Sequence, residues 1–497
     1  MTIHQALPLL IIATSLMPAI LIFFLREGAN RARTTLNLGG ALLKLGLVLV
    51  MFREVSFGHE VMFEYSLMPG LSLKLHADPL SMLLTSLSSI LWLLTTFYAI
   101  GYLEESPNRR RFFGFFSLCV TTTIGIAMAG NLITLLIFYE LLTLTTYPLV
   151  VHRGNTKSIE AGRVYLAYTM VGGGVLLVGV IWLQALAGGF DFTATGYLSG
   201  MPVEYNAQLQ VIFFMLIIGF GVKAAIVPLH GWLPLAMVAP APVSALLHAV
   251  AVVKAGAFGI VRVVYDVYGI EFADELGLLV PLAFAASVTI VYGSIRALFQ
   301  DDIKRRLAFS TVSQVSYIAL GSAIFGPMAT VGGIVHLVHQ GIMKITLFFC
   351  AGNFAETLGI HKVSEMNGVG RRMPLTMGAF TIGALGMIGV PPIAGFFSKW
   401  YLGLGGIDSG HYWVIGVLIT SSILNAAYFL PVLYRGWFRD PAGAWPEDRQ
   451  YSERFETAPL LLFPPLATAS ICILVGVFAG APWSPLHWAR LIMLGEF

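Results

Sequence analysis

The chain has 497 residues, of which 57% are hydrophobic and only 11% charged, and its formal net charge is +3. This charged share is about half that of a soluble domain, which argues against a soluble globular protein, and the small positive charge does not suggest a nucleic-acid partner. We therefore expect an all-α polytopic membrane protein embedded in a lipid bilayer.

Hydrophobic periodicity predicts about fourteen transmembrane helices and no soluble domain. The mixed stretch 54–78 is expected to lie along the outer surface, and residues 435–456 to form a polar loop. The predicted helices cover 5–25, 34–52, 79–101, 112–129, 131–151, 163–187, 209–229, 243–266, 276–299, 306–325, 329–354, 374–400, 411–434 and 458–481.

Arginine and lysine gather in alternate loops, and such loops face the cytoplasm in most membrane proteins. We expect a multi-pass protein of the inner or cytoplasmic membrane with both termini on the non-cytoplasmic side. The basic loops are at 26–33, 109–111, 153–157, 304–306, 362–372 and 435–454.

Two lysines and two histidines lie in the apolar stretch 223–254, and they are Lys223, His230, His248 and Lys254. An isolated charge at the bilayer centre costs roughly 3 kcal/mol, so such side chains usually line a protein or water interior. Several prolines interrupt any helix between the lysines, and broken backbone at this depth is tolerated only where protein buries it or where it lines a wet cavity. The alternative is that the two lysines snorkel from helix ends.

Two other charged residues lie inside predicted spans. Lys44 is in NLGGALLKLGLVLVMF, where a snorkelling or interhelical structural role is the favoured interpretation. Glu140 is in the middle of NLITLLIFYELLTLTTYPLVV, and the candidate cations beside it are Lys223 and Lys254. A fixed structural salt bridge is the alternative for Glu140.

The second half of the chain repeats this combination of charge and helix breakers. His336, Gln340 and Lys344 follow one another at four-residue steps, which places them on one helix face over about 12 Å, whereas His339 points elsewhere. Pro391-Pro392 predicts a second broken helix, followed by Lys399.

Two broken helices five spans apart suggest an internal duplication. Because a repeat of five helices is odd, the second copy would be inverted, and inverted repeats with broken helices indicate an ion path. The predicted regions are helices 1–3 (residues 1–110), a first repeat of helices 4–8 (111–270), a second repeat of helices 9–13 (271–440), and a C-terminal loop with helix 14 (441–497).

Several segments together resemble the antiporter-like subunits of respiratory complex I and of Mrp-type cation/proton antiporters, with the D-type component of the Mrp antiporter the most similar. They are FYELLTLTTYPLV, KAAIVPLHGWLP, APAPVSALLHAVAVVKAG, DDIKRRLAFSTVSQ, the HxxxQxxxK pattern at 336–344, and PPIAGFFSK. The resemblance implies fourteen helices, two inverted five-helix repeats, and breaks in helices 7 and 12.

The resemblance also implies a proton relay of Glu140, Lys223, Lys254, His336 and Lys399. In that family Glu140 would pair with Lys223, Lys254 would bridge the two halves, and Lys399 would end the relay. His230, His248, His339, Gln340 and Lys344 would support it.

The chain departs from the family pattern in three places. Leu235 follows Trp232-Leu233-Pro234 where the family commonly has an aspartate, so a loop carboxylate is absent. Gln340 replaces a second histidine and cannot take up a proton. The chain has no room for the long lateral C-terminal helix of the largest complex I subunit of this type.

The function that these features favour is proton translocation, alone or in exchange for Na⁺, by one membrane subunit of a multisubunit complex. The alternatives are a proton-pumping subunit of an NADH:quinone-type or hydrogenase-type respiratory complex, a quinone-binding redox subunit, and an inorganic-carbon uptake partner of the same fold. We expect no cofactor and no metal site, because the sequence offers no haem ligand pair, iron–sulfur cysteine set, nucleotide-binding glycine motif or nucleophile triad.

Overall fold

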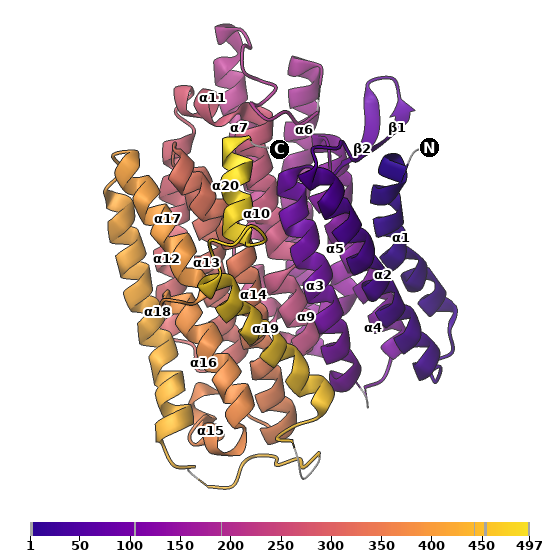
Figure 1. The fold of residues 1–497 in the computed structure, drawn as a ribbon, viewed down its shortest axis with the longest axis vertical. Helices are drawn as coiled ribbons and strands as arrows, with labels where there is room; N and C mark the ends of the chain where they lie inside the picture. Colours follow the sequence, from indigo (N-terminus) through magenta and orange to yellow (C-terminus); the bar gives the residue numbers. More distant parts are fainter. Residues whose placement is uncertain (1–2, 104–105, 190, 442, 452–454, 496–497) are drawn as a thin grey trace.

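The computed structural model describes residues 3–103, 106–189, 191–441, 443–451 and 455–495, and it is mostly helical (Figure 1). Long helices run side by side along the long axis of the molecule, and both termini lie towards the same end. Eleven helices in the described part are long and apolar enough to cross a membrane. We call the end with the termini the terminal end and the opposite one the loop end.

The helices follow one another in the chain with short connections. The first half contains α1 (Ile3–Phe24), α2 (Asn30–Ser56), α3 (Pro79–Tyr102), α4 (Arg109–Ala127), α5 (Leu132–Val150), α6 (Thr156–Ala187), α7 (Asn206–Ala224), α8 (Trp232–Leu235), α9 (Ala241–Ala249), α10 (Val252–Arg262), a π-helical turn (Val263–Tyr268) and α11 (Ile270–Glu275). The second half contains α12 (Leu279–Leu298), α13 (Ile303–Ser322), α14 (Pro327–Leu358), α15 (Val369–Arg372), α16 (Pro374–Ile388), α17 (Ala394–Asp408), α18 (Trp413–Phe438), α19 (Pro459–Val477) and α20 (Pro485–Leu494).

Each predicted span coincides with one of these helices or with the two halves of a broken one. The number of helices that cross the bilayer, the inverted repeats and the four predicted regions remain predictions.

The expectation of an all-α chain is wrong at residues 62–76, where β1 (Met62–Met68) and β2 (Leu71–His76) form an antiparallel hairpin at the terminal end (Figure 1). Gly70 adopts φ +76° in the turn between the strands, a conformation that glycine accepts without strain. In β2 the residues Leu71, Leu73 and Leu75 alternate with polar ones, which is the period of a strand with one face covered.

Breaks interrupt the helices at three places. Helix α7 ends where Ala225 takes a left-handed conformation, and α16 ends at Gly389 (φ +98°), just before Pro391-Pro392. Both breaks agree with the prediction from the prolines. The continuous helix predicted for 243–266 is wrong, because α9 and α10 are separated at Val250–Ala251. No proline lies at this third break, so tertiary packing determines its position.

Helix α14 lies at the centre of the fold, where it packs against α9, α13, α16, α17 and α19. The apolar windows of α14 and of the segment Ala241–Tyr268 are buried entirely within the described protein. Polar side chains on α10 and α14 are therefore enclosed by protein rather than by lipid.

Candidate ion-transfer site

Lys223 lies in the last turn of α7 and is wholly buried. Its Nζ donates to the backbone carbonyl of Tyr139 on α5 and lies 3.4 Å from the centre of the Tyr139 ring. The Tyr139 hydroxyl donates back to the carbonyl of Gly219 on α7 at 2.8 Å. These contacts fix the lysine against α5, and Lys223 does not snorkel.

Glu140, the next residue on α5, is half-buried and points at α6. A Cβ atom at Gly173 would lie 2.3 Å from its Oε1, so the carboxylate occupies the space that this glycine leaves open. Glu140 and Lys223 interact electrostatically, yet no ion pair within 4.0 Å joins them among the described residues. The two charges are therefore neighbours without a direct salt bridge.

Lys254 lies on α10, wholly buried, and its Nζ has no hydrogen-bond partner among the described residues. The helix presses directly on the end of α7, because a Cβ atom at Gly256 would lie 2.2 Å from the backbone nitrogen of Ala224. This close approach brings the backbone of the Lys254 helix against that of the Lys223 helix. Lys254 does not snorkel either.

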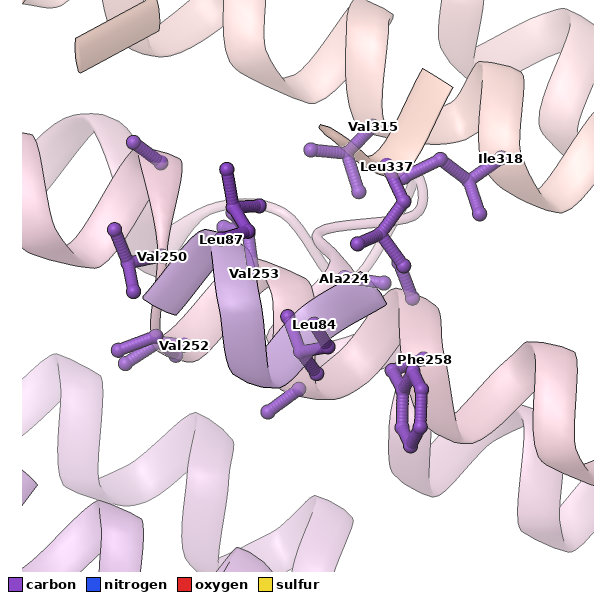
Figure 2. Close-up of a cluster of buried hydrophobic side chains, with 14 of the residues drawn as sticks. Leu84, Leu87, Ala224, Val250, Val252, Val253, Phe258, Val315, Ile318 and Leu337 are labelled. Atoms are coloured by element: carbon purple, nitrogen blue, oxygen red, sulfur yellow. The ribbon is translucent and has the colours of Figure 1, made fainter. Parts of the chain in front are cut away.

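An apolar cluster occupies the space around the α9–α10 break (Figure 2). Its labelled members come from α3, α7, α10, α13, α14 and the break itself, and they are Leu84, Leu87, Ala224, Val250, Val252, Val253, Phe258, Val315, Ile318 and Leu337. Val253 directly precedes Lys254 in the chain, and Ala224 directly follows Lys223. The two lysines are therefore separated by a region that offers no polar side chain.

The polar stripe on α14 faces α13 and α17. His336 Nδ1 lies 2.8 Å from Ser398 Oγ on α17, and Lys344 Nζ donates to Ser310 Oγ on α13 at 2.8 Å. Gln340, between them, is wholly buried and has no hydrogen-bond partner in the described part.

His339 is also wholly buried, close to the backbone of Ala394 at the start of α17. Lys254 interacts electrostatically with His336, His339 and Lys344. The structure therefore brings α10 and α14 together as one polar neighbourhood that includes His339.

Lys399, on α17, fills the break between α16 and α17. Its Nζ donates to the carbonyls of Met387 (3.0 Å) and Ile388 (2.8 Å) and to Ser422 Oγ (3.1 Å). These carbonyls are free because α16 ends here, and the negative end of the helix dipole favours a cation at this position. The predicted break thus supplies the acceptors for the predicted lysine.

The two remaining histidines differ in their surroundings. The ring of His248 on α9 lies 4.6 Å from that of Phe348, and His248 is electrostatically close to Lys304 and Lys344. His230 is half-buried in the connection after α7, with its ring 5.0 Å from that of Tyr292 on α12. The structure therefore places His248 with the polar residues of α14 and His230 at their margin.

Cavities lie on either side of this buried chain. At the loop end, a cavity of about 620 Å³ is lined by residues that include Arg153, Lys157 and Glu160, and by Lys304, which donates to the carbonyl of Ala239 at 2.5 Å. Lys304 is not among the residues expected from the sequence to take part, although its motif DDIKRR is one of those that carry the family resemblance. Because Lys304 is electrostatically close to His248, this cavity leads towards the buried histidine.

At the terminal end, a cavity of about 530 Å³ contains an ion triad that was not expected from the sequence. Arg262 lies 2.6 Å from Asp78 and 2.7 Å from Asp266. The four-residue spacing of Arg262 and Asp266 on one helix was the available signal. Arg262 is eight residues beyond Lys254, about 12 Å along the helix, so this cavity lies beyond the Lys254 end of the chain.

One group of three metal-binding side chains occurs in the described part, at the terminal end. Ligand atoms of His4, Glu54 and His59 lie within 4.8 Å of one another. This group belongs to α1, α2 and the segment after α2, outside the buried chain of lysines and histidines.

Comparisons with known proteins agree with this architecture. The family described as "NADH:quinone oxidoreductase/Mrp antiporter, TM" matches residues 129–425, and "NADH-Ubiquinone oxidoreductase (complex I), chain 5 N-terminus" matches 69–113. NADH-quinone oxidoreductase subunit N of Desulforudis audaxviator is 36% identical over 376 residues, which cover 75% of this chain and 74% of the relative. NADH-quinone oxidoreductase subunit L of Mycobacterium tuberculosis is 30% identical, covering 88% of this chain and 68% of the relative.

A chain of the Mrp complex from a Dietzia species has the same fold, with a TM-score of 0.86 at 23% identity, covering 100% of this chain and 98% of that one. The particular similarity to the D-type Mrp component remains a prediction. The matched family covers more than half of the chain, and this multi-pass integral membrane protein belongs to the NADH:quinone oxidoreductase/Mrp antiporter family.

Proposed function

We propose that the chain is a proton-translocating membrane subunit of a multisubunit complex, in which protons pass between Glu140, Lys223, Lys254, His336 and Lys399. The observation that carries this proposal is a series of buried ionisable side chains on α5, α7, α10, α14 and α17, at the centre of the fold. Buried ionisable groups within a membrane usually mark ion pathways.

The charges of this series do not balance, because Glu140 is its only carboxylate. Lys223, Lys254, Lys344 and Lys399 cannot all be charged without strong repulsion and a large desolvation cost. A proton that arrives at one of them therefore makes the charged form of its neighbours less favourable. Such coupling lets a proton entering at one end displace a proton at the other.

The apolar cluster around Lys254 gives this series a switch. A proton can pass from Lys223 to Lys254 only when water or a side-chain movement bridges the cluster. We propose that the charge on the Glu140–Lys223 pair controls this event, because both lysines lie on backbones in direct contact at Gly256.

The relatives support membership in a larger assembly, since each belongs to a multisubunit complex by its name or title. We propose other membrane subunits as partners, the inner or cytoplasmic membrane as the location, and the basic loop end as the cytoplasmic side. Exchange of protons for Na⁺ and redox-driven pumping both agree with the proposed relay. Dependence of proton flux on Na⁺, compared with dependence on a reduced electron donor, distinguishes them.

Glu140→Gln tests the proposal, with proton flux measured in vesicles that contain the assembled complex. Removing the carboxylate leaves Lys223 without its electrostatic partner, and we expect flux to fall at least about tenfold, equivalent to about 1.4 kcal/mol of barrier. Glu204→Gln, at an exposed position in the turn before α7, is the matched control and should transport normally. Equal flux in Glu140→Gln and wild type, at equal assembly, would contradict the proposal.

A further inference from the structure

Lys44 is a wholly buried lysine in the middle of α2, away from the series described above. Its Nζ donates to Ser15 Oγ on α1 at 2.7 Å and lies 4.7 Å from the centre of the Trp92 ring on α3. The side chain points between helices, so the snorkelling interpretation is wrong for this residue.

No counter-charge faces Lys44 from the described helices packed against α2. On α1, α3 and α4 the groups near it are Ser15, Trp92 and Thr121, and α3 contains no charged residue at all. The charged residues of these four helices lie towards helix ends, at His4, Arg31, Arg33, Arg53, Glu54 and Arg109–Arg111. Along α2, Arg33 and Arg53 are about 16 Å and about 14 Å away.

A polar column joins Lys44 to the loop end of the protein. Ser15 Oγ accepts from Thr121 Oγ1 at 2.9 Å, one turn away along α4 Ser117 Oγ donates to Asn37 Oδ1 at 2.9 Å, and Asn37 Nδ2 donates to the carbonyl of Arg33 at 2.9 Å. Arg33 in turn donates to the carbonyl of Glu27 at 3.0 Å, in the α1–α2 loop. Arg33, Asn37 and Lys44 share one face of α2, because their spacings of four and seven residues are helical.

An interhelical structural role does not require a lysine at this position. One hydrogen bond to Ser15 could come from a neutral donor, with no cost of placing a charge in an apolar interior. What a lysine adds is the capacity to carry and release a proton.

We propose that Lys44 is a further proton-binding group, which exchanges its proton with the loop end of the protein along this polar column. The hydroxyls of Ser15, Thr121 and Ser117 can pass a proton, because a hydroxyl both donates and accepts. The Asn37 amide can only hold hydrogen bonds, so water completes the path between Ser117 and Arg33. This role makes helices α1–α4 part of the proton machinery, and it rests on the proposed function only through the use of proton flux as a readout.

Two substitutions at Lys44 separate proton exchange from a fixed charge, with flux and assembly measured in the same vesicles. Lys44→Met retains an unbranched side chain of similar size but carries no proton, and Lys44→Arg retains the charge but cannot release it. We expect both to lower flux at least about fivefold in assembled complex. Lys362→Met, which removes an exposed lysine in the connection after α14, should have no effect. Wild-type flux in Lys44→Arg would show a fixed structural charge and overturn the proposal.

A substitution in the column keeps the proposal testable if the Lys44 variants do not assemble. Ser117→Ala removes the bond to Asn37, and we expect it to lower flux, whereas Ser89→Ala removes only a bond to the backbone of its own helix and should not. Normal flux in Ser117→Ala overturns the column. If Glu140→Gln slows transport while Lys44→Met does not, this inference fails alone; if Glu140→Gln has no effect, the proposed function fails.

Discussion

Gly173→Ala should displace the Glu140 carboxylate without disturbing the fold. The added Cβ would lie 2.3 Å from Oε1, against the 3.4 Å at which ordinary contact begins, so the carboxylate must move by about 1.1 Å. The obstructed atoms are the end of a flexible side chain, which can move aside at little cost. Alanine is also the better helix former by about 1 kcal/mol, so α6 should not be weakened.

A displacement of about 1 Å in a catalytic arrangement can lower a rate by about 100-fold. We therefore expect Gly173→Ala to lower proton flux between about 10-fold and 100-fold, measured in vesicles with assembly checked by purification of the complex. Gly174→Ala is the matched control, because no atom lies within 4 Å of its added Cβ. If Gly173→Ala and Gly174→Ala transport equally, the position of the Glu140 carboxylate does not matter and the reasoning is refuted.

Two further predictions concern α14 and the ion triad. His336→Ala should lower proton flux more than His339→Ala, because His336 contacts Ser398 on the helix of the terminal lysine, and the reverse ranking would contradict this geometry. Asp78→Ala should lower the thermal midpoint of the purified protein by removing the N-cap of α3, at a cost of about 1 kcal/mol or more, and Asp78→Asn should cost less; equal midpoints would show that the cap contributes nothing. Burial raises the pKa of the Asp78 carboxyl, but the Arg262 guanidinium outweighs it and holds the pKa below its ordinary value, so its stabilisation is present above about pH 4 and should be lost as the pH falls further.

The helix breaks show what local sequence can predict about this fold. Prolines and glycines act on the backbone of their own segment, which is why the ends of α7 and α16 were predictable. The α9–α10 break has no such residue, and a Cβ at Gly341 of α14 would lie 2.9 Å from the carbonyl of Ala249 beside it. That break depends on contacts between distant segments. The β-hairpin could have been found from the alternating leucines of β2, which a search for helical spans overlooks.

The candidate site divides in the same way. Lys223, Lys254 and Lys399 were predictable because a charge stands out in an apolar run. Their surroundings were not, because the Tyr139 ring, the Gly173 gap and the free carbonyls of α16 meet the charges only after the helices pack. His339 was expected on a face apart from His336, and the structure shows why that separation matters little: both faces of α14 are enclosed by other helices.

The proton flux of Lys254→Arg in assembled complex tests the proposed relay most directly. Lys254 has no carboxylate partner and no hydrogen bond in the described structure, so a fixed positive charge has nothing to stabilise there. Arginine keeps its proton under all physiological conditions, whereas histidine can exchange one. We expect Lys254→Arg to assemble but to transport poorly, and Lys254→His to retain part of the flux. Wild-type flux in Lys254→Arg would show that protons do not pass through this residue.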